Sequence, residues 1–519
     1  FIVDASCHDE ASTEDPDAPA ALVIHLYTKE PDGTARTLHW TNQKIRFYVE
    51  CPPGFKMNEW MSMLRDHVRG HAFSCRRVVR SKLMGFIPDQ DGHTAKSAFV
   101  EITVSSLAAR RSIVWSLRPR TRGRIAEGFH EKCVDAGVIP RSRDGVTVCH
   151  ASLCPMQQAM VRCGGAPAMW IDARPDADGM VTDVAFDAAC DDPPPMLRCL
   201  SYDIETGWAP GRLAAHVGAF PQSYDPEGRI IQIGMTYLDG EAVAAERVLC
   251  LGDTRCDALE VRCASNETEL LDMFGRDIIA MDPDCVTGYN IHGFDVDWIV
   301  ARGEYIRLFR RYATASGAVE DWQWARHYMR RFPAKAPREE QRDWLRAEGA
   351  ARADRGYDTR GGCSPDVTAD RLSRYRDAQA VGRAWAYFSR LDEPRDLWRC
   401  SRYGDGTCTM DISTSKMGAD CQRLHMEGRL TVDLFEHVKE QYASTFKSFS
   451  LKNVANHFLA DLPKIDLDYH EMFAHFDSCC PDRRGTIAAY CSRDCAIPAR
   501  LCIKLSVWQN LLEMSRVTG

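Results

Sequence analysis

The sequence predicts a β-rich α+β domain over residues 1–195, followed by an α/β domain with a mixed sheet over residues 196–515. The first third of the chain carries runs of alternating apolar and polar residues, which is the pattern of half-buried strands. A polar stretch with three prolines at residues 191–195 is typical of a linker. Beyond it, strand-like runs give way to alternating helix and strand patterns, and 519 residues are enough for roughly two to four domains.

Strand patterns dominate the first domain. Residues 21–27 and 46–50 are predicted strands on either side of a turn-forming Glu-Pro-Asp-Gly at residues 30–33. Two further segments, at residues 97–104 and 158–161, are strand-like or amphipathic. We therefore expect a compact sheet domain before the linker.

The second domain opens with three predicted strands in a row, at residues 196–206, 229–237 and 247–251, which indicates a meander. A helix over residues 266–274 follows, with Asn266 at the capping position. The helix leads to a short strand that ends at Tyr289, so the pattern becomes α/β.

The end of the chain predicts a strand and helix at residues 430–437, a helix at 450–458 and a long helix at about 485–514. Between these elements and the earlier strands lies a segment of about residues 307–425 that is rich in Arg, Asp, Ala and Trp. We interpret this segment as an insertion without an assigned role.

Composition limits the possible functions. With 45% hydrophobic and 27% charged residues and no apolar run of about 18 residues, the chain is predicted to be a globular protein without a membrane role. No secretory signal is recognisable, and none of the 22 cysteines forms a Cys-x-x-Cys pair, so we expect reduced thiols inside the cell rather than a zinc ribbon. The net charge of −8 argues against a surface that is wholly a nucleic-acid clamp, but not against a nuclease whose site concentrates carboxylates.

Three short blocks carry acids in a suggestive arrangement. Asp203 and Glu205 are two residues apart on a predicted strand, so the pleat places both carboxylates on one face. Asp295 lies just beyond a strand end, at the start of an apolar helix, where an acid could also simply complement the helix dipole. Tyr490 and Asp494 are four residues apart and share one helix face, as many surface neighbours do.

Each block alone is unremarkable, because an isolated charge pair is usually solvated. Together, four acids delivered by strand ends and a late helix match the needs of a two-metal phosphodiesterase site, with hard cations roughly 4 Å apart bound by oxygen. Such a carboxylate cluster repels itself unless cations fill it. The arrangement therefore predicts two divalent metal ions, Mg²⁺ or Mn²⁺.

The three blocks, in this order, resemble the three exonuclease motifs of the family B DNA polymerases. The Tyr-x-x-x-Asp form of the third block resembles the tyrosine subclass of the DEDD nucleases. The resemblance is to delta-type enzymes of eukaryotes or large DNA viruses, and it implies a ribonuclease H-like exonuclease domain after an N-terminal domain of the polymerase type. Flanking segments share the resemblance: residues 289–295, 450–458, 462–467 and 513–519, and more loosely residues 47–55, 84–86 and 169–171.

The resemblance implies a role for each acid. Asp203, Glu205 and Asp494 would hold the metals, and Asp295 would complete the site directly or through water. Tyr490, together with Glu205, would orient the attacking water in line with the scissile phosphodiester.

The same resemblance implies three DNA-binding residues. Asn290 would hydrogen-bond the frayed single-stranded 3′ end, and Phe294 would pack on its base or sugar. Lys464 would hold the scissile phosphate, although without the resemblance an ordinary exposed lysine is nearly as good an interpretation. We interpret Asp433, at a similar strand-to-helix junction, as structural.

The function implied is metal-dependent 3′→5′ proofreading of DNA. Motifs of the polymerase palm, fingers and thumb are absent from these residues, so the polymerase domain is expected downstream. Implied partners are DNA and, through other parts, a sliding clamp or replisome subunits, in the nucleus or at a viral replication site. The alternatives are a free-standing DEDD nuclease and a non-catalytic DNA-binding scaffold; four mutually repelling acids argue against the scaffold.

Overall fold

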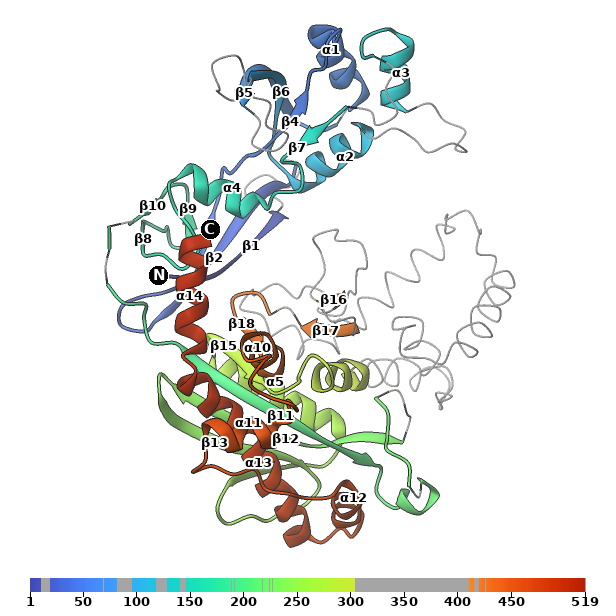
Figure 1. The fold of residues 1–519 in the computed structure, drawn as a ribbon, viewed down its shortest axis with the longest axis vertical. Helices are drawn as coiled ribbons and strands as arrows, with labels where there is room; N and C mark the ends of the chain where they lie inside the picture. The colour runs from blue at the N-terminus through green and yellow to red at the C-terminus, as the bar shows by residue number, and fades with distance from the viewer. Residues whose placement is uncertain are drawn as a thin grey trace, which may run out of the picture. The chain divides into compact units, whose positions relative to one another are not determined.

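The fold is taken from a computed structural model, shown in Figure 1. The chain divides into two compact units, which we call unit 1 (Phe1–Pro194 with Leu512–Gly519) and unit 2 (Pro195–Leu511). The structure describes residues 1–10, 19–68, 70–81, 96–117, 128–140, 146–187, 189–190, 192–216, 218–223, 225, 227–303, 410–414, 420–424 and 426–518.

Unit 1 is rich in strands. Its described residues form two four-stranded sheets, of order β1-β2-β3-β9 and β5-β6-β4-β7, and a two-stranded sheet of β10 and β8. Short helices complete the unit. The bounds are β1 Ile2–Glu10, β2 Ala21–Lys29, β3 Ala35–Trp40, β4 Ile45–Glu50, α1 Met57–His67, β5 Phe73–Ser81, β6 Lys96–Val104, α2 Leu107–Leu117, α3 Phe129–Asp135, β7 Val148–Cys149, α4 Pro155–Arg162, β8 Ile171–Ala173, β9 Met180–Val181 and β10 Val184–Phe186.

The two strands predicted in unit 1 are present as β2 and β4, and the segment at residues 97–104 forms most of strand β6. The turn at residues 30–33 joins β2 to β3, a strand that the sequence did not reveal, and β4 pairs with β6 and β7 in the other sheet. Only Leu38 and Trp40 are buried in β3, so its apolar pattern is weak. Residues 158–161 belong to helix α4, not to a strand.

Unit 2 is built on a six-stranded mixed sheet of order β14-β13-β12-β11-β15-β18. Strands β11, β12 and β13 run antiparallel, as the predicted meander requires, whereas β14, β15 and β18 each pair in parallel. The predicted α/β class with a mixed sheet is therefore confirmed. The strands are β11 Arg198–Trp208, β12 Gly228–Asp239, β13 Ala242–Leu251, β14 Glu260–Ala264, β15 Cys285–Gly288 and β18 Leu430–Asp433; β16 Met410–Thr414 and β17 Asp420–Leu424 form a separate pair.

Helices cover both faces of this sheet. On β13, Val248 and Cys250 pack against Ala488 of α13, while the alternating residues Leu249 and Leu251 belong to the core that contains α5. Helix α13 therefore lies over one face of β11 and β12 (Figure 1), and α5 lies on the other. The bounds are η1 Leu213–His216, α5 Glu267–Met281, α10 Leu434–Gln441, α11 Leu451–Phe458, α12 Tyr469–Asp477, α13 Pro481–Lys504 and α14 Val507–Thr518.

The helix ends differ from the sequence predictions in two places. The Asn266 side chain caps α5 by accepting from the Glu269 N–H at 3.0 Å, as predicted, but the helix continues seven residues beyond residue 274, to Met281. The predicted single helix at 485–514 is wrong, because α13 ends at Lys504 and a new helix, α14, starts at Val507. Between them, Ser506 has a left-handed φ of 48° that no continuous helix accommodates. Most of the insertion predicted at 307–425 lies outside the described residues.

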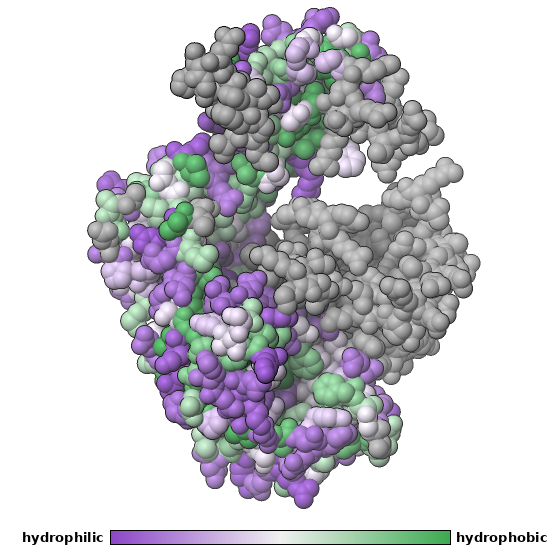
Figure 2. Space-filling view, in the orientation of Figure 1, coloured by the Kyte–Doolittle hydropathy of each residue, from purple (hydrophilic) through white to green (hydrophobic). Residues whose placement is uncertain are grey.

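The surface of unit 2 is largely polar on the visible face, where hydrophilic residues surround smaller hydrophobic patches (Figure 2). Within the described part of the chain, no helix has both the length and the apolar character to cross a membrane. Every cysteine whose side chain is described is a free thiol.

Candidate metal-binding active site

Strand β11 presents Asp203 and Glu205 to helix α13. Asp203 lies opposite Gly234 on β12, and Gly234 lies opposite Val248, which faces α13. A side chain at Gly234 would meet the Cys491 and Cys495 sulfurs within 3 Å. The glycine therefore allows α13 to pack closely over the strand that carries both acids.

Asp295 reaches these acids from the segment that follows β15. It is the first residue of a helix over residues 295–303, and its carboxylate accepts a hydrogen bond from the Ile204 N–H at 3.0 Å. Ile204 separates Asp203 from Glu205, so this bond ties the start of the helix to the acidic part of β11. The Asp295 side chain is only 2% exposed.

Asp433, at the end of β18, organises the segment before Asp295. Its carboxylate accepts hydrogen bonds from the backbone N–H groups of Asn290 at 2.7 Å and His292 at 2.9 Å, and it also caps α10 through Phe435. The interpretation of Asp433 as structural agrees with these contacts. Asn290 has a left-handed φ of 65°, and the two hydrogen bonds to Asp433 hold the backbone in that conformation.

Helix α13 contributes Tyr490 and Asp494. Lys464, from the segment between α11 and α12, donates to Asp494 Oδ2 at 2.6 Å, and its Nζ lies 5.1 Å from the centre of the Tyr490 ring. The other carboxylate oxygen, Asp494 Oδ1, is buried without a hydrogen-bond partner. The alternative interpretation of Lys464 as an ordinary exposed lysine therefore does not apply, because its side chain is only 19% exposed and pairs with Asp494.

Burial and, after it, mutual charge repulsion raise the pKa values of these acids. Burial, and then the neighbouring Asp295 and Glu205 carboxylates, raise the pKa of Asp203 well above its usual range. Burial, and then Asp494, raise the pKa of Glu205, and burial raises the pKa of Asp295 to about 8. These mutual interactions place all four predicted acids in one electrostatic cluster.

The residues present suit a divalent cation. Lys464 supplies one positive charge against four acids, and the buried Asp494 Oδ1 has no partner. A hard cation would satisfy this oxygen and offset the repulsion. The donor set is therefore appropriate for a metal, and Asp203, Glu205, Asp295 and Asp494 are the residues that would bind it.

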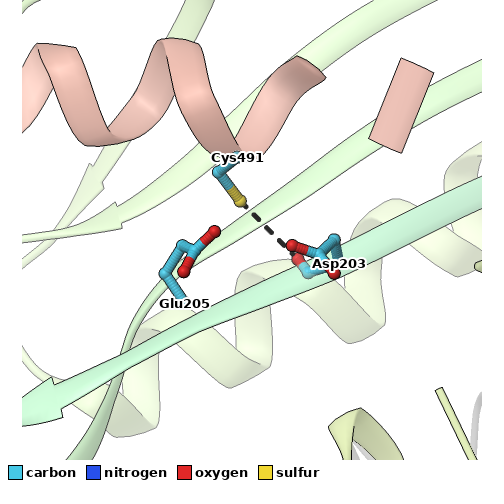
Figure 3. Close-up of side chains that lie close together, drawn as sticks. All are labelled: Asp203, Glu205 and Cys491. Atoms are coloured by element: carbon cyan, nitrogen blue, oxygen red, sulfur yellow. Dashed lines mark hydrogen bonds between the residues drawn. The ribbon is translucent and has the colours of Figure 1, made fainter. Parts of the chain in front are cut away.

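Cys491 is a member of this cluster that the sequence analysis missed. Its sulfur and carboxylate oxygens of Asp203 and Glu205 all lie within 4.8 Å of one another (Figure 3). The thiol, on α13, points toward β11 and donates to the backbone oxygen of Asp203 at 3.8 Å. Its place directly after Tyr490 is the only sequence signal that could have indicated it.

The two predicted strand-binding residues flank the cluster. Asn290 is exposed and immediately precedes the turn that leads to Asp295. Phe294 is half-buried, with ring contacts to Phe220 and Trp298 at 6.4 and 6.2 Å. Both side chains are partly accessible, and their contact with DNA stays a prediction.

The raised pKa of Asp295 predicts a pH-dependent response to magnesium. Because its pKa is 3.8 in model peptides and about 8 in the folded chain, folding without metal binds a proton, and stability falls as the pH rises from about 4 toward 8. Metal binding favours the ionised carboxylate and releases that proton. We expect magnesium to raise the melting temperature more at pH 8 than at pH 6, measured by calorimetry. An equal rise at both pH values, or an undiminished pH dependence in Asp295→Asn, would contradict this.

Comparison with known proteins shows a similarity to DNA polymerases. Residues 171–331, which include Asp203, Glu205 and Asp295, match the family model "DNA polymerase family B, exonuclease domain". Tyr490 and Asp494 lie beyond that match. The DNA polymerase delta catalytic subunit of Dictyostelium discoideum is 23% identical over 63% of this chain and 22% of its own length. That of Bos taurus is 22% identical over 97% of this chain and 38% of its own length.

A solved structure shares the fold. The family B DNA polymerase of Pyrobaculum calidifontis matches 99% of this chain and 47% of its own chain, with a TM-score of 0.53 and 15% identity. The chain thus spans less than half the length of these relatives. Together with the mixed sheet, the match confirms the predicted ribonuclease H-like fold and the β-rich region before it. Residues 171–331 thus match the exonuclease domain of the family B DNA polymerases, and the chain as a whole is similar to delta-type catalytic subunits.

Proposed function

We propose that this chain hydrolyses DNA from its 3′ end in a metal-dependent reaction and that it is the proofreading part of a DNA polymerase. The observation that carries the proposal is the convergence of Asp203, Glu205, Asp295 and Asp494 beside Tyr490. These residues come from β11, from the start of the helix at 295–303 and from α13. A shared site with this donor set supports phosphodiester hydrolysis.

The cofactor we propose is a pair of divalent ions, Mg²⁺ or Mn²⁺. Asp203, Glu205 and Asp494 would hold them, with Asp295 completing the site directly or through water. When bound, such ions supply Lewis-acid stabilisation of the charge that develops on the phosphate and on the leaving 3′ oxygen. No covalent intermediate with the protein is needed.

Two side chains orient the attacking water in this proposal. Tyr490 interacts electrostatically with Asp494, Glu205 and Asp203, and burial raises its pKa, so its hydroxyl keeps its proton and can donate a hydrogen bond. Glu205, whose charge acts on Tyr490, offers carboxylate oxygens nearby. Together they would hold a water in line with the scissile bond.

Lys464 has a position suited to substrate exchange. Its ammonium now pairs with Asp494 Oδ2 at 2.6 Å. A cation held by Asp494 would weaken that attraction, and the Lys464 ammonium would then be able to contact an incoming phosphate. We propose this exchange as the way in which Lys464 holds the scissile phosphate.

Asn290 and Phe294 complete the proposed substrate site. Asn290 would hydrogen-bond the unpaired 3′ nucleotide, and Phe294 would pack on its base or sugar. The fixed backbone at Asn290, held by Asp433, supports a precise placement of that contact. An unpaired 3′ end can make both contacts, whereas the base of a paired end is already hydrogen-bonded and stacked in the duplex.

The wider setting is also proposed. Residues 1–195 would form the N-terminal domain of the polymerase type and residues 196–515 the exonuclease domain, interrupted by the segment at about 307–425. These residues carry no palm, finger or thumb motif, so we expect no nucleotide incorporation from them alone. We place the activity inside the cell, in the nucleus or at a viral replication site, with sliding-clamp or replisome contacts made by other parts.

The proposal is tested with oligonucleotides labelled at the 5′ end. We expect magnesium or manganese to support stepwise shortening from the 3′ end, faster for single-stranded and mismatched ends than for a matched duplex, and excess chelator to stop it. An RNA strand of the same sequence distinguishes the alternatives, because equal digestion of RNA favours a free-standing nuclease. Chelator-insensitive digestion, or release of the 5′ label first, would overturn the proposal.

A further inference from the structure

The acidic cluster contains one ligand of a different chemical kind. The Cys491 sulfur and carboxylate oxygens of Asp203 and Glu205 lie within 4.8 Å of one another, with Cys491 on α13 and both acids on β11 (Figure 3). Among the described residues, this is the group of three side chains arranged to hold a metal ion. The thiol is fully buried, and its proton is donated to the Asp203 carbonyl.

A second observation points to a ligand at this place. Asp494, one helical turn beyond Cys491 on the same helix, has a side chain only 6% exposed, and its Oδ1 is unpartnered. Asp494 is also the strongest charged neighbour of Glu205. A buried carboxylate oxygen without a partner is costly, and a cation bound beside it by the three grouped ligands would remove that cost.

Sulfur changes which cation the position prefers. Magnesium takes oxygen ligands and gains nothing from a thiol, whereas zinc and cadmium bind thiolate and carboxylate together. A sulfur and an oxygen on one zinc ion are separated by at most about 4.4 Å, the sum of Zn–S and Zn–O distances near 2.3 and 2.1 Å. The observed group needs to close by only a few tenths of an ångström to meet that limit.

We propose that Cys491, with Asp203 and Glu205, forms a site for a thiophilic divalent cation such as Zn²⁺ or Cd²⁺, which competes with magnesium and inhibits the nuclease. The inference rests on the proposed metal-dependent function. On binding, the S–H bond of Cys491 breaks, its proton passes to solvent and a sulfur–metal bond forms. The sulfur then holds the cation where the carboxylates would otherwise bind magnesium.

Cadmium titration of the purified chain provides the direct measurement. A cadmium–thiolate bond gives a charge-transfer band in the ultraviolet, which is read independently of activity. We expect Cys491→Ser to lose this band and Cys495→Ser, a matched buried thiol one turn along α13, to keep it. A band that survives in Cys491→Ser, or that is lost only in Cys495→Ser, overturns the inference.

A second variant covers the case in which Cys491→Ser does not fold. Asp203→Asn keeps the thiol and removes one ligand charge, so cadmium affinity measured by the same band is expected to fall roughly tenfold or more. Unchanged affinity places the cation elsewhere and refutes the site. In parallel, zinc added to the unaltered chain is expected to suppress magnesium-supported digestion.

The two proposals fail in different ways. Magnesium-supported digestion that zinc and cadmium do not inhibit, with no cadmium band at Cys491, leaves the proposed nuclease intact and rejects the thiophilic site. A cadmium band at Cys491 in a chain that digests no DNA with magnesium rejects the nuclease, while the cation site itself remains.

Discussion

Replacing Asp203 with alanine is expected to lower magnesium-dependent removal of 3′ nucleotides by roughly 10³-fold or more, since loss of a single stabilising group at a reacting centre already costs about 10²–10³. Asp203 is central in the cluster: it interacts with Asp295, Glu205 and Asp494 and lies beside Cys491. Its removal takes away a proposed metal ligand without cutting any backbone hydrogen bond of β11. The rate is measured from single-turnover shortening of a 5′-labelled strand.

The control for this variant is an acid outside the cluster. Asp257 has an exposed side chain in the loop after β13, so Asp257→Asn should digest DNA at the unaltered rate. Asp203→Ala should also melt at or above the temperature of the metal-free parent, because it relieves charge repulsion. Digestion by Asp203→Ala at a rate near that of Asp257→Asn would remove the basis of the proposed function.

Arg302→Ala is expected to destabilise unit 2 by about 3–5 kcal/mol, the usual cost of leaving one partner of a buried ion pair alone. The Arg302 guanidinium is fully buried and donates to both carboxylate oxygens of Glu267, at 2.8–3.1 Å, and to the Asp225 carbonyl. Glu267 also accepts from the Ile230 N–H on β12. The alanine variant leaves the buried Glu267 charge with the more distant Arg229 guanidinium, whose Nε lies 3.8 Å from Glu267 Oε2, so the expected loss is toward the lower end of this range.

This pair links stability to the site. Arg302 lies in the helix that begins at Asp295, and Glu267 is the first residue of α5, which packs in the same core as that helix. Loss of the Arg302–Glu267 pair should therefore lower both the rate of digestion and the free energy of unfolding. The free energy of unfolding is measured by denaturant titration. Arg302→Met combined with Glu267→Gln removes both charges and should recover most of the stability. A loss below about 1 kcal/mol in Arg302→Ala, or no recovery in the double variant, would contradict the buried-pair argument.

Local sequence patterns predicted much of the fold of unit 2. The alternation of residues 196–206, 229–237 and 247–251 predicted β11, β12 and β13 in their antiparallel order, and Asn266 predicted the start of α5. These features depend on neighbours within a few residues, where side-chain period and capping chemistry act directly. Strand pairing in unit 1 joins residues farther apart, and β3, the partner that follows β2 after the turn, was not predicted.

By itself, the sequence determined the element types of the exonuclease domain and the identity of the acids, because strand and helix periods fix which side chains share a face. Only the tertiary structure decided which distant residues meet: Gly234 lets α13 approach β11, and that approach brings Cys491 to Asp203. It likewise decided that Lys464 pairs with Asp494. Such contacts join residues separated by up to 288 positions, and packing of helix on sheet, which no local pattern encodes, sets them.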